Sequence, residues 1–124
     1  MGIRVYVAGP LNSSGLVTEN VRKAVQAGIA LMSLGYVPFV PHVNVLMEMI
    51  APRSEAEWVA WDLQWLDACD ILLRLPGYSV HSDKEVEFAE RKRIPVFHSI
   101  DDIENAYGGM KHLPVYRTRM EVEG

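Results

Sequence analysis

A predominantly apolar run at residues 71–75, Ile-Leu-Leu-Arg-Leu, most constrains how this chain can fold. The run has the length of one buried strand, and Pro76-Gly77 ends it. Ser82 and Glu85 are then spaced as a capping box, which predicts a helix over residues 82–93. In open parallel sheets, ligands bind beyond the carboxyl ends of the strands, where loops meet helix N-termini. The loop after this strand is therefore a candidate ligand site.

The rest of the chain alternates between strand and helix signals. Strands are predicted at residues 3–8, 36–40 and 95–98, and helices at residues 18–34, 54–68 and 101–107. Gly35 is a C-terminal cap for the first helix, and Ser54 with Glu57 forms a capping box for the second. This alternation predicts an α/β fold, a single-domain Rossmann-like or flavodoxin-like three-layer sandwich with a parallel sheet of four or five strands. The loop after Gly9 and the loop that holds Ser79 would then face each other across a cleft.

Two segments leave alternatives open. Residues 42–52 are apolar, and a turn of helix that covers the core is favoured over the wall of a pocket or a subunit contact. Trp58, Trp61 and Trp65 share one face of the predicted second helix, which favours packing over stacking on a base. Asp62 lies beside this stripe, and simple exposure to solvent is the default expectation for it.

The composition supports one domain over residues 1–124 and argues against several classes of partner. Sixteen acidic and 12 basic residues give a net charge of −4 without a long block of one sign, so duplex nucleic acid and anionic membrane are poor partners. Cys69 is the only cysteine, which favours a reducing cytoplasm. No stretch approaches the length of a membrane span, and no leader pattern is seen, so a soluble cytoplasmic protein is predicted. Residues 115–117 form either an edge strand or a contact with a neighbouring subunit.

Elimination leaves carboxylate chemistry. The loop after the first strand lacks G-x-G-x-x-G and the P-loop pattern, so no nucleotide cofactor is expected. No pair of Cys or His has metal-ligand spacing, so no metal is expected either. Neither Ser79 nor Cys69 lies in a nucleophile-elbow pattern. The remaining candidates are Glu85, at the start of the predicted helix, and Asp62, on the preceding helix.

Three motifs, in the right order, resemble the nucleoside 2-deoxyribosyltransferase superfamily. They are Val5-Tyr6-Val7-Ala8-Gly9, the stretch Asp-Leu-Gln-Trp-Leu-Asp-Ala-Cys-Asp at residues 62–70, and Ser79 followed by Glu85 and Ala89. The resemblance covers most of the chain to about Phe97 and is closest to the 2′-deoxynucleoside 5′-monophosphate N-glycosidase branch. It implies cleavage of an N-glycosidic bond through a covalent glycosyl-glutamate intermediate.

The resemblance implies a role for each matching residue. Glu85 would be the nucleophile, Asp62 would hold the sugar hydroxyls or assist proton transfer, and Tyr6 would orient Glu85. Ser79 stands where the hydrolases bind a 5′-phosphate with a serine and the transferases place an acid. The implied substrate-binding residues are Gly9, Pro10, Leu11, Asn12, Ser13, His42, Ser79, His81 and Ser82.

The chain also departs from the N-glycosidase branch. Val80-His81-Ser82 replaces a glycine-rich turn, and residues 12–14 lack the arginine of the first loop. Hydrolysis is favoured; transfer of deoxyribose between bases is the alternative, and a non-catalytic nucleotide-binding module or a plain interaction domain are the rivals. The implied partners are a small-molecule nucleoside or nucleotide and further copies of the chain, in a homodimer or larger homo-oligomer.

The predicted helix start bears on the ionisation of Glu85. A carboxylate that attacks an anomeric carbon must be ionised, and a helix N-terminus lowers the pKa of a nearby carboxyl group. We therefore expect a lowered pKa for Glu85. On spacing alone the favoured role of this residue is a helix cap; with the resemblance it is the nucleophile.

Overall fold

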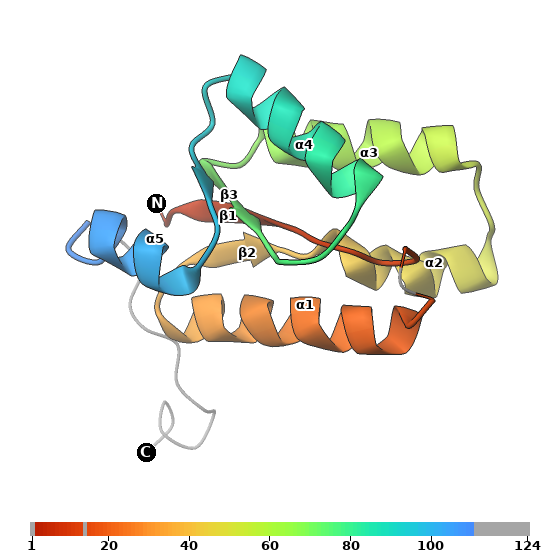
Figure 1. Ribbon diagram of the computed structural model, residues 1–124, viewed down its shortest axis with the longest axis horizontal. Helices are drawn as coiled ribbons and strands as arrows, with labels where there is room; N and C mark the ends of the chain where they lie inside the picture. The colour runs from red at the N-terminus through yellow and green to blue at the C-terminus, as the bar shows by residue number, and fades with distance from the viewer. Residues whose placement is uncertain (1, 14, 111–124) are drawn as a thin grey trace.

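Parallel strands form one sheet in the order β2-β1-β3-β4 (Figure 1). The computed structural model describes residues 2–13 and 15–110, so the predicted edge strand at 115–117 lies outside the described residues. The strands are β1 (Arg4–Ala8), β2 (Val37–Phe39), β3 (Ile71–Arg74) and β4 (Val96–Phe97). β1 and β3 lie side by side in the middle, as in the flavodoxin-like order, so the predicted α/β fold is confirmed.

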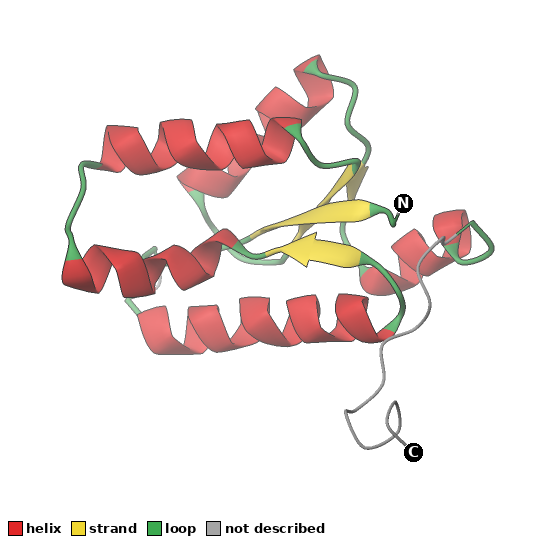
Figure 2. Cartoon of the chain, turned by 180° about the vertical axis from the view of Figure 1, so that it is seen from behind, coloured by secondary structure: helices red, strands yellow, loops and turns green. Residues whose placement is uncertain are grey.

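Helices cover both faces of the sheet (Figures 1 and 2). They are α1 (Val17–Ser33), α2 (Val45–Ile50), α3 (Glu55–Asp67), α4 (Val80–Arg91) and α5 (Ile100–Tyr107), with a 3-10 helix, η1 (Pro41–Asn44). α1 and α5 pack on one face and α3 and α4 on the other, which gives the predicted three layers. Within the described residues, every helix is too short or too polar to cross a membrane.

Alternate residues of β1 point into two separate hydrophobic clusters. Val5 and Val7 pack with residues of α1 and α5, whereas Tyr6 and Ala8 pack with residues of α3 and α4. All four side chains are fully buried. A strand that is buried on both faces must be apolar throughout, which explains the continuous apolar runs in the sequence. The same alternation directs Tyr6 toward the face that α4 covers.

Serine side chains cap the starts of α3 and α4. Ser54 Oγ accepts a hydrogen bond from the backbone N–H of Glu57 at 3.2 Å, which confirms the predicted start of α3. α4 begins two residues earlier than predicted, because Ser79 Oγ accepts from the backbone N–H of Ser82 at 3.1 Å. The predicted capping box of Ser82 and Glu85 is therefore wrong. Ser82 lies in the first turn of α4, and Glu85 lies in the second.

Within residues 42–52, only His42 is buried. They fold mainly into η1 and α2, and no residue of α2 is buried. Leu46, Met49 and Ile50 expose 63%, 75% and 87% of their surface, and Trp61 of α3 exposes 47%. The prediction of a core segment is therefore wrong, because apolar content alone does not say what a helix faces. We call the exposed group of Leu46, Met49, Ile50 and Trp61 the α2–α3 surface.

The loop after β1 and the loop after β3 face each other, as predicted, and they touch. A Cβ on Gly9 would lie 3.0 Å from Leu75 Cβ. A Cβ on Gly77 would lie 2.8 Å from Pro10 Cγ, and Gly77 has a φ of +113°, which residues with a side chain rarely adopt. At these positions, direct packing takes the place of the expected open cleft.

Candidate active site

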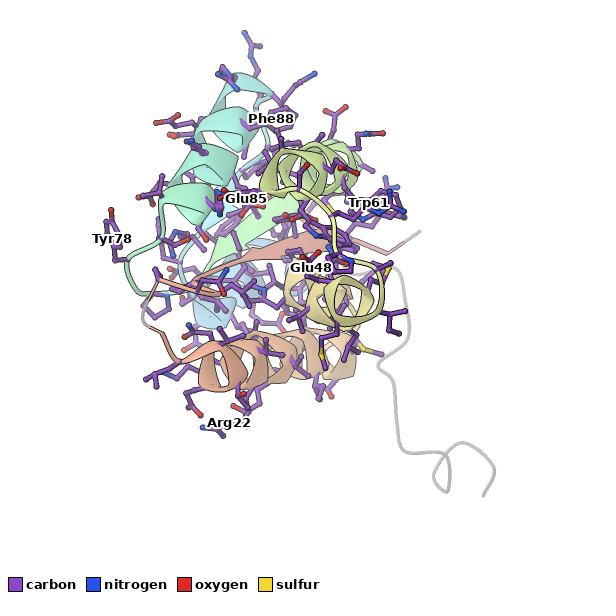
Figure 3. The ribbon with its side chains drawn as sticks, turned by 90° about the vertical axis from the view of Figure 1, so that its right-hand side faces the viewer. Arg22, Glu48, Trp61, Tyr78, Glu85 and Phe88 are labelled. Atoms are coloured by element: carbon purple, nitrogen blue, oxygen red, sulfur yellow. The ribbon has the colours of Figure 1, made fainter. Side chains whose placement is uncertain are left out.

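A hydrogen bond joins β1 to α4 at the centre of the site. The hydroxyl of Tyr6, which is fully buried, donates to Glu85 Oε2. In Figure 3, Glu85 lies on the inner side of α4, toward the sheet. Burial raises the pKa of Tyr6 well above its usual range, and the nearby carboxylates of Glu85 and Asp62 raise it further. Tyr6 therefore keeps its proton and acts as a donor to the Glu85 carboxylate.

Asp62 is the second carboxyl group of the site. It lies on α3, is partly buried, and accepts a hydrogen bond from Asn44 Nδ2 at 3.0 Å. Burial raises the pKa of Asp62 to about 7, against the Asn44 hydrogen bond, which lowers it. The default expectation of simple solvent exposure is therefore wrong for this residue.

The pKa of Glu85 shifts in the direction opposite to our expectation. Burial raises the pKa of this group to about 7; the Tyr6 hydrogen bond lowers it, the charge of Asp62 raises it, and the charge of Arg74 lowers it. The effect of a helix dipole falls off within the first turn, and Glu85 lies in the second turn of α4. Desolvation therefore outweighs the dipole.

Two carboxyl groups with pKa values of about 7 make one coupled acid–base unit. The charge on Asp62 raises the pKa of Glu85, so ionisation of one group disfavours ionisation of the other. Near neutral pH, the pair therefore holds about one proton. The Tyr6 hydrogen bond and the Arg74 charge favour the ionised form of Glu85, and the Asn44 hydrogen bond favours the ionised form of Asp62.

This pair predicts that the chain loses stability as the pH rises. The folded-state pKa values of Glu85 and Asp62 lie above their usual values of 4.5 and 3.8, so the folded state binds more protons between about pH 4 and 7. The free energy of unfolding should therefore fall over this window by roughly 1–3 kcal/mol, allowing for partial exposure. Urea unfolding from pH 4.5 to 8.5 measures it. Glu85→Gln should gain stability over wild type as the pH rises; a constant difference would contradict the assignment.

The first loop is held by contacts with neighbouring segments. Ser13 Oγ donates to the backbone oxygen of Tyr78, in the loop after β3. The backbone oxygen of Leu11 accepts from Asn20 Nδ2 at 2.8 Å, and that of Asn12 accepts from the backbone N–H three residues later at 2.9 Å. The predicted residues of this loop therefore lie beside the loop that precedes α4.

His42 supports the first loop from below. Its ring is only 4% exposed, and Nε2 lies 3.0 Å from the backbone oxygen of Gly9 and 3.1 Å from that of Pro10. Because both partners are acceptors, Nε2 carries the proton, and Nδ1 is buried without a hydrogen-bond partner among the described residues. Burial lowers the pKa of His42, which favours the neutral ring.

Of the three predicted substrate-binding residues at the start of α4, two are buried and one is exposed. Ser79 and Ser82 are buried at 6% and 1% exposure, in the capping contact. His81 is exposed, and its Nε2 lies 2.6 Å from Glu55 Oε1 at the start of α3. Its role in substrate binding stays a prediction, and in this structure it pairs with α3.

Two residues of the site were missed in the sequence. Arg74 lies at the carboxyl end of β3, and its charge acts on Glu85. Asn44 contacts Asp62 from the segment that we interpreted as core. The signal for Arg74 was present, because a charged residue that ends a buried parallel strand lies at the ligand edge of the sheet. No signal linked Asn44 to Asp62 across 18 residues of sequence.

Two cavities are formed by the loops and helices that also carry or support residues of the site. One, of about 390 Å³, is lined by α1 and the two loops, with Pro10, Ser13, Leu75 and Tyr78 among its residues. The other, of about 440 Å³, is lined by α2, α3 and the turn between them, with Met47, Ile50, Trp58 and Trp61 among its residues. The walls of these two cavities do not include Tyr6, Asp62 or Glu85. Across residues 2–13 and 15–110, no three His, Cys, Asp or Glu side chains gather to hold a metal ion.

Comparison with known proteins identifies a similar fold. No protein-family model matches the chain, and no curated protein matches it significantly. The solved structure of a 2-deoxyribosyltransferase from the psychrotolerant bacterium Bacillus psychrosaccharolyticus is similar, with a TM-score of 0.57 and 21% sequence identity. The match covers 92% of this chain and 99% of the other. At this identity, the similarity establishes that the two chains share a fold.

Proposed function

We propose that this chain cleaves the N-glycosidic bond of a 2′-deoxynucleoside or its 5′-monophosphate, with Glu85 as the nucleophile. The observation that carries the proposal is the Tyr6–Glu85 hydrogen bond, together with a second carboxyl group, Asp62, whose charge raises the pKa of Glu85. These three residues come from β1, α4 and α3, and the sequence motifs that resemble the nucleoside 2-deoxyribosyltransferases contain all three. The shared fold with a 2-deoxyribosyltransferase supports the same assignment.

The proposed reaction has two steps. A carboxylate oxygen of Glu85 attacks C1′ of the sugar, the bond from C1′ to the base breaks, and Asp62 gives its proton to the base. Water then attacks C1′ of the glycosyl ester, Asp62 takes a proton from the water, and Glu85 leaves as a carboxylate. Tyr6 donates to one oxygen of Glu85, so the other oxygen is the one that attacks.

The protonation states fit these roles. Glu85 must be ionised to attack, and Asp62 must be protonated to help the base leave. Burial favours the protonated form of both carboxyl groups, and the Tyr6 hydroxyl and the Arg74 charge favour ionised Glu85. The proposed reaction uses the state of the pair in which Glu85 is ionised and Asp62 holds the proton. The rate should therefore be greatest near neutral pH and fall on both sides.

We favour water over a second base as the acceptor. The support is Ser79, which stands where the resemblance implies an acid in transferases. Its hydroxyl is buried and caps α4, so it places no carboxylate beside a leaving base. Transfer of deoxyribose between bases remains the alternative, supported by the activity named for the structural neighbour.

One experiment separates the candidate functions. The protein is incubated with each 2′-deoxynucleoside and each 5′-monophosphate, with and without a second base, and free base is measured by chromatography. Release without an acceptor supports hydrolysis, and release only with a second base supports transfer. Binding without release would instead support a nucleotide-binding module. If the protein neither binds any of these compounds nor releases a base, a plain interaction domain is the remaining function.

We also propose that the α2–α3 surface binds a second copy of the chain. Leu46, Met49, Ile50 and Trp61 are exposed apolar side chains, and Ile50 and Trp61 line one cavity together. Ile50→Asp should therefore reduce the molar mass measured by light scattering after gel filtration to that of a monomer. Ile29→Asp, at an exposed site on α1, should leave the mass unchanged. A monomeric wild type would contradict this proposal.

A further inference from the structure

Arg74 lies on the same face of the sheet as the candidate catalytic residues. It pairs with Ala8 in the register of β1 and β3, and Ala8 points to the same side as Tyr6. Its side chain is only 10% exposed. An arginine side chain is rarely so deeply buried unless its charge is paired and its N–H groups are satisfied. The contacts of Arg74 therefore indicate what it does.

The guanidinium of Arg74 holds the loop between β3 and α4. Its Nη1 donates to the backbone oxygen of Leu75, and its Nη2 donates to the backbone oxygen of Gly77 at 2.8 Å. Nη2 also lies 3.2 Å from Oδ1 of Asp83, on the first turns of α4. One side chain thus connects the end of β3, the turn at Gly77 and the helix that carries Glu85.

The charged groups around Glu85 come from each element packed against it. β1 contributes the Tyr6 hydroxyl, α3 contributes Asp62, β3 contributes Arg74, and α4 itself contributes Asp83, which pairs with the guanidinium. Among the described residues, Arg74 is the one cation whose charge lowers the pKa of Glu85. Because the side chain is largely excluded from water, its field is weakly screened.

We propose that Arg74 is a positioning residue of the site: it holds the loop between β3 and α4, and it places a positive charge on the face of the sheet that α4 and Glu85 cover. The catalytic half of this proposal rests on the proposed function. The guanidinium contacts backbone oxygens and Asp83, and it need not touch the substrate. Its charge stabilises the ionised Glu85 that the first step requires.

The test separates charge from loop contacts with two variants. Arg74→Gln removes both the charge and the branched guanidinium group. Arg74→Lys keeps the charge but loses the two nitrogens that reach the backbone oxygens of Leu75 and Gly77. Arg91→Gln, at an exposed position in the last turn of α4, is the control for net charge. In Arg74→Gln, the acidic limb of the pH–rate profile should move to higher pH, with a loss in kcat/KM about tenfold greater at pH 6 than at pH 8.5. Arg74→Lys should restore the position of the limb, and Arg91→Gln should not move it.

Two readouts do not depend on turnover. Carbon-13 NMR titration of the carboxyl groups, with Glu85→Gln to assign the signal, should show a higher Glu85 pKa in Arg74→Gln than in wild type. Amide hydrogen exchange should be faster at residues 75–79 in both variants. An unchanged Glu85 titration would overturn the charge role, and unchanged exchange would overturn the loop role. If wild type releases no base, the proposed function fails, and these two measurements still decide the role of Arg74.

Discussion

Glu85→Gln is expected to reduce base release on the order of a thousandfold or more while the protein stays folded. Glutamine has nearly the same shape and still accepts from the Tyr6 hydroxyl, but its amide cannot attack C1′ and form the glycosyl ester. It also removes a carboxylate that is partly buried, so above pH 7 the variant should unfold at a higher urea concentration than wild type. Loss of activity with a gain in stability is a combination that a merely structural glutamate would not produce.

The matched control for this prediction is Glu87→Gln. Glu87 lies on α4 two residues further on and is exposed, so the substitution changes the same charge on the same helix away from the Tyr6 contact. It should retain the wild-type rate. Mass spectrometry of wild type quenched during turnover should show a deoxyribosyl group on the peptide that contains Glu85. Full activity in both Glu85→Gln and Glu85→Ala would remove the nucleophile from the proposal.

The strands could be predicted because their causes are local. Residues 71–73 of β3 are buried, with side chains in both hydrophobic clusters, and a strand segment that is buried on both faces has to be apolar. Ser54 caps α3 because its hydroxyl reaches the N–H of Glu57 within the same turn. Signals of this kind depend on a few neighbouring residues, which the sequence supplies directly.

The start of α4 was mispredicted because two local signals overlap. Ser79 with Ser82 and Ser82 with Glu85 have the same spacing of three residues, so either serine could cap the helix. In the structure Ser79 is the cap, and the Glu85 carboxylate instead accepts from the hydroxyl of Tyr6, which lies 79 residues earlier in the chain. Local propensity could not resolve a choice that depends on a contact between distant strands and helices.

The pKa of Glu85 could not be predicted for a related reason. A helix N-terminus is visible in sequence, but the amount of water that tertiary packing removes from a carboxyl group is not. The exposure of α2 could not be predicted either, because apolar residues such as Met49 and Ile50 give the same sequence pattern in a buried helix and in an exposed one. Burial is a property of the assembled fold, and both errors concern burial.

Asp62→Asn should remove the proton that the leaving base needs, at a cost of about 10²- to 10⁴-fold in kcat for natural substrates. Asparagine still accepts from Asn44 Nδ2 through its side-chain oxygen, so the position of the side chain is retained. The basic limb of the pH–rate profile should disappear, because no group remains that must be protonated. The acidic limb should move to lower pH, because the charge of Asp62 no longer raises the pKa of Glu85.

The leaving group decides whether Asp62 acts as an acid or only holds the sugar. With a nitrophenyl 2-deoxyriboside, whose leaving group departs without a proton, Asp62→Asn should lose less than about tenfold in the first step, measured as the burst of nitrophenol. Asp67→Asn, at an exposed position of α3 that pairs with Lys92 at 3.7 Å, is the control and should retain activity on both substrates. An equal loss on the two substrates would show that Asp62 binds the sugar hydroxyls, since binding is needed whichever group leaves. A loss confined to natural bases would mean that the partly buried carboxyl group of Asp62, with its pKa raised to about 7, supplies the proton.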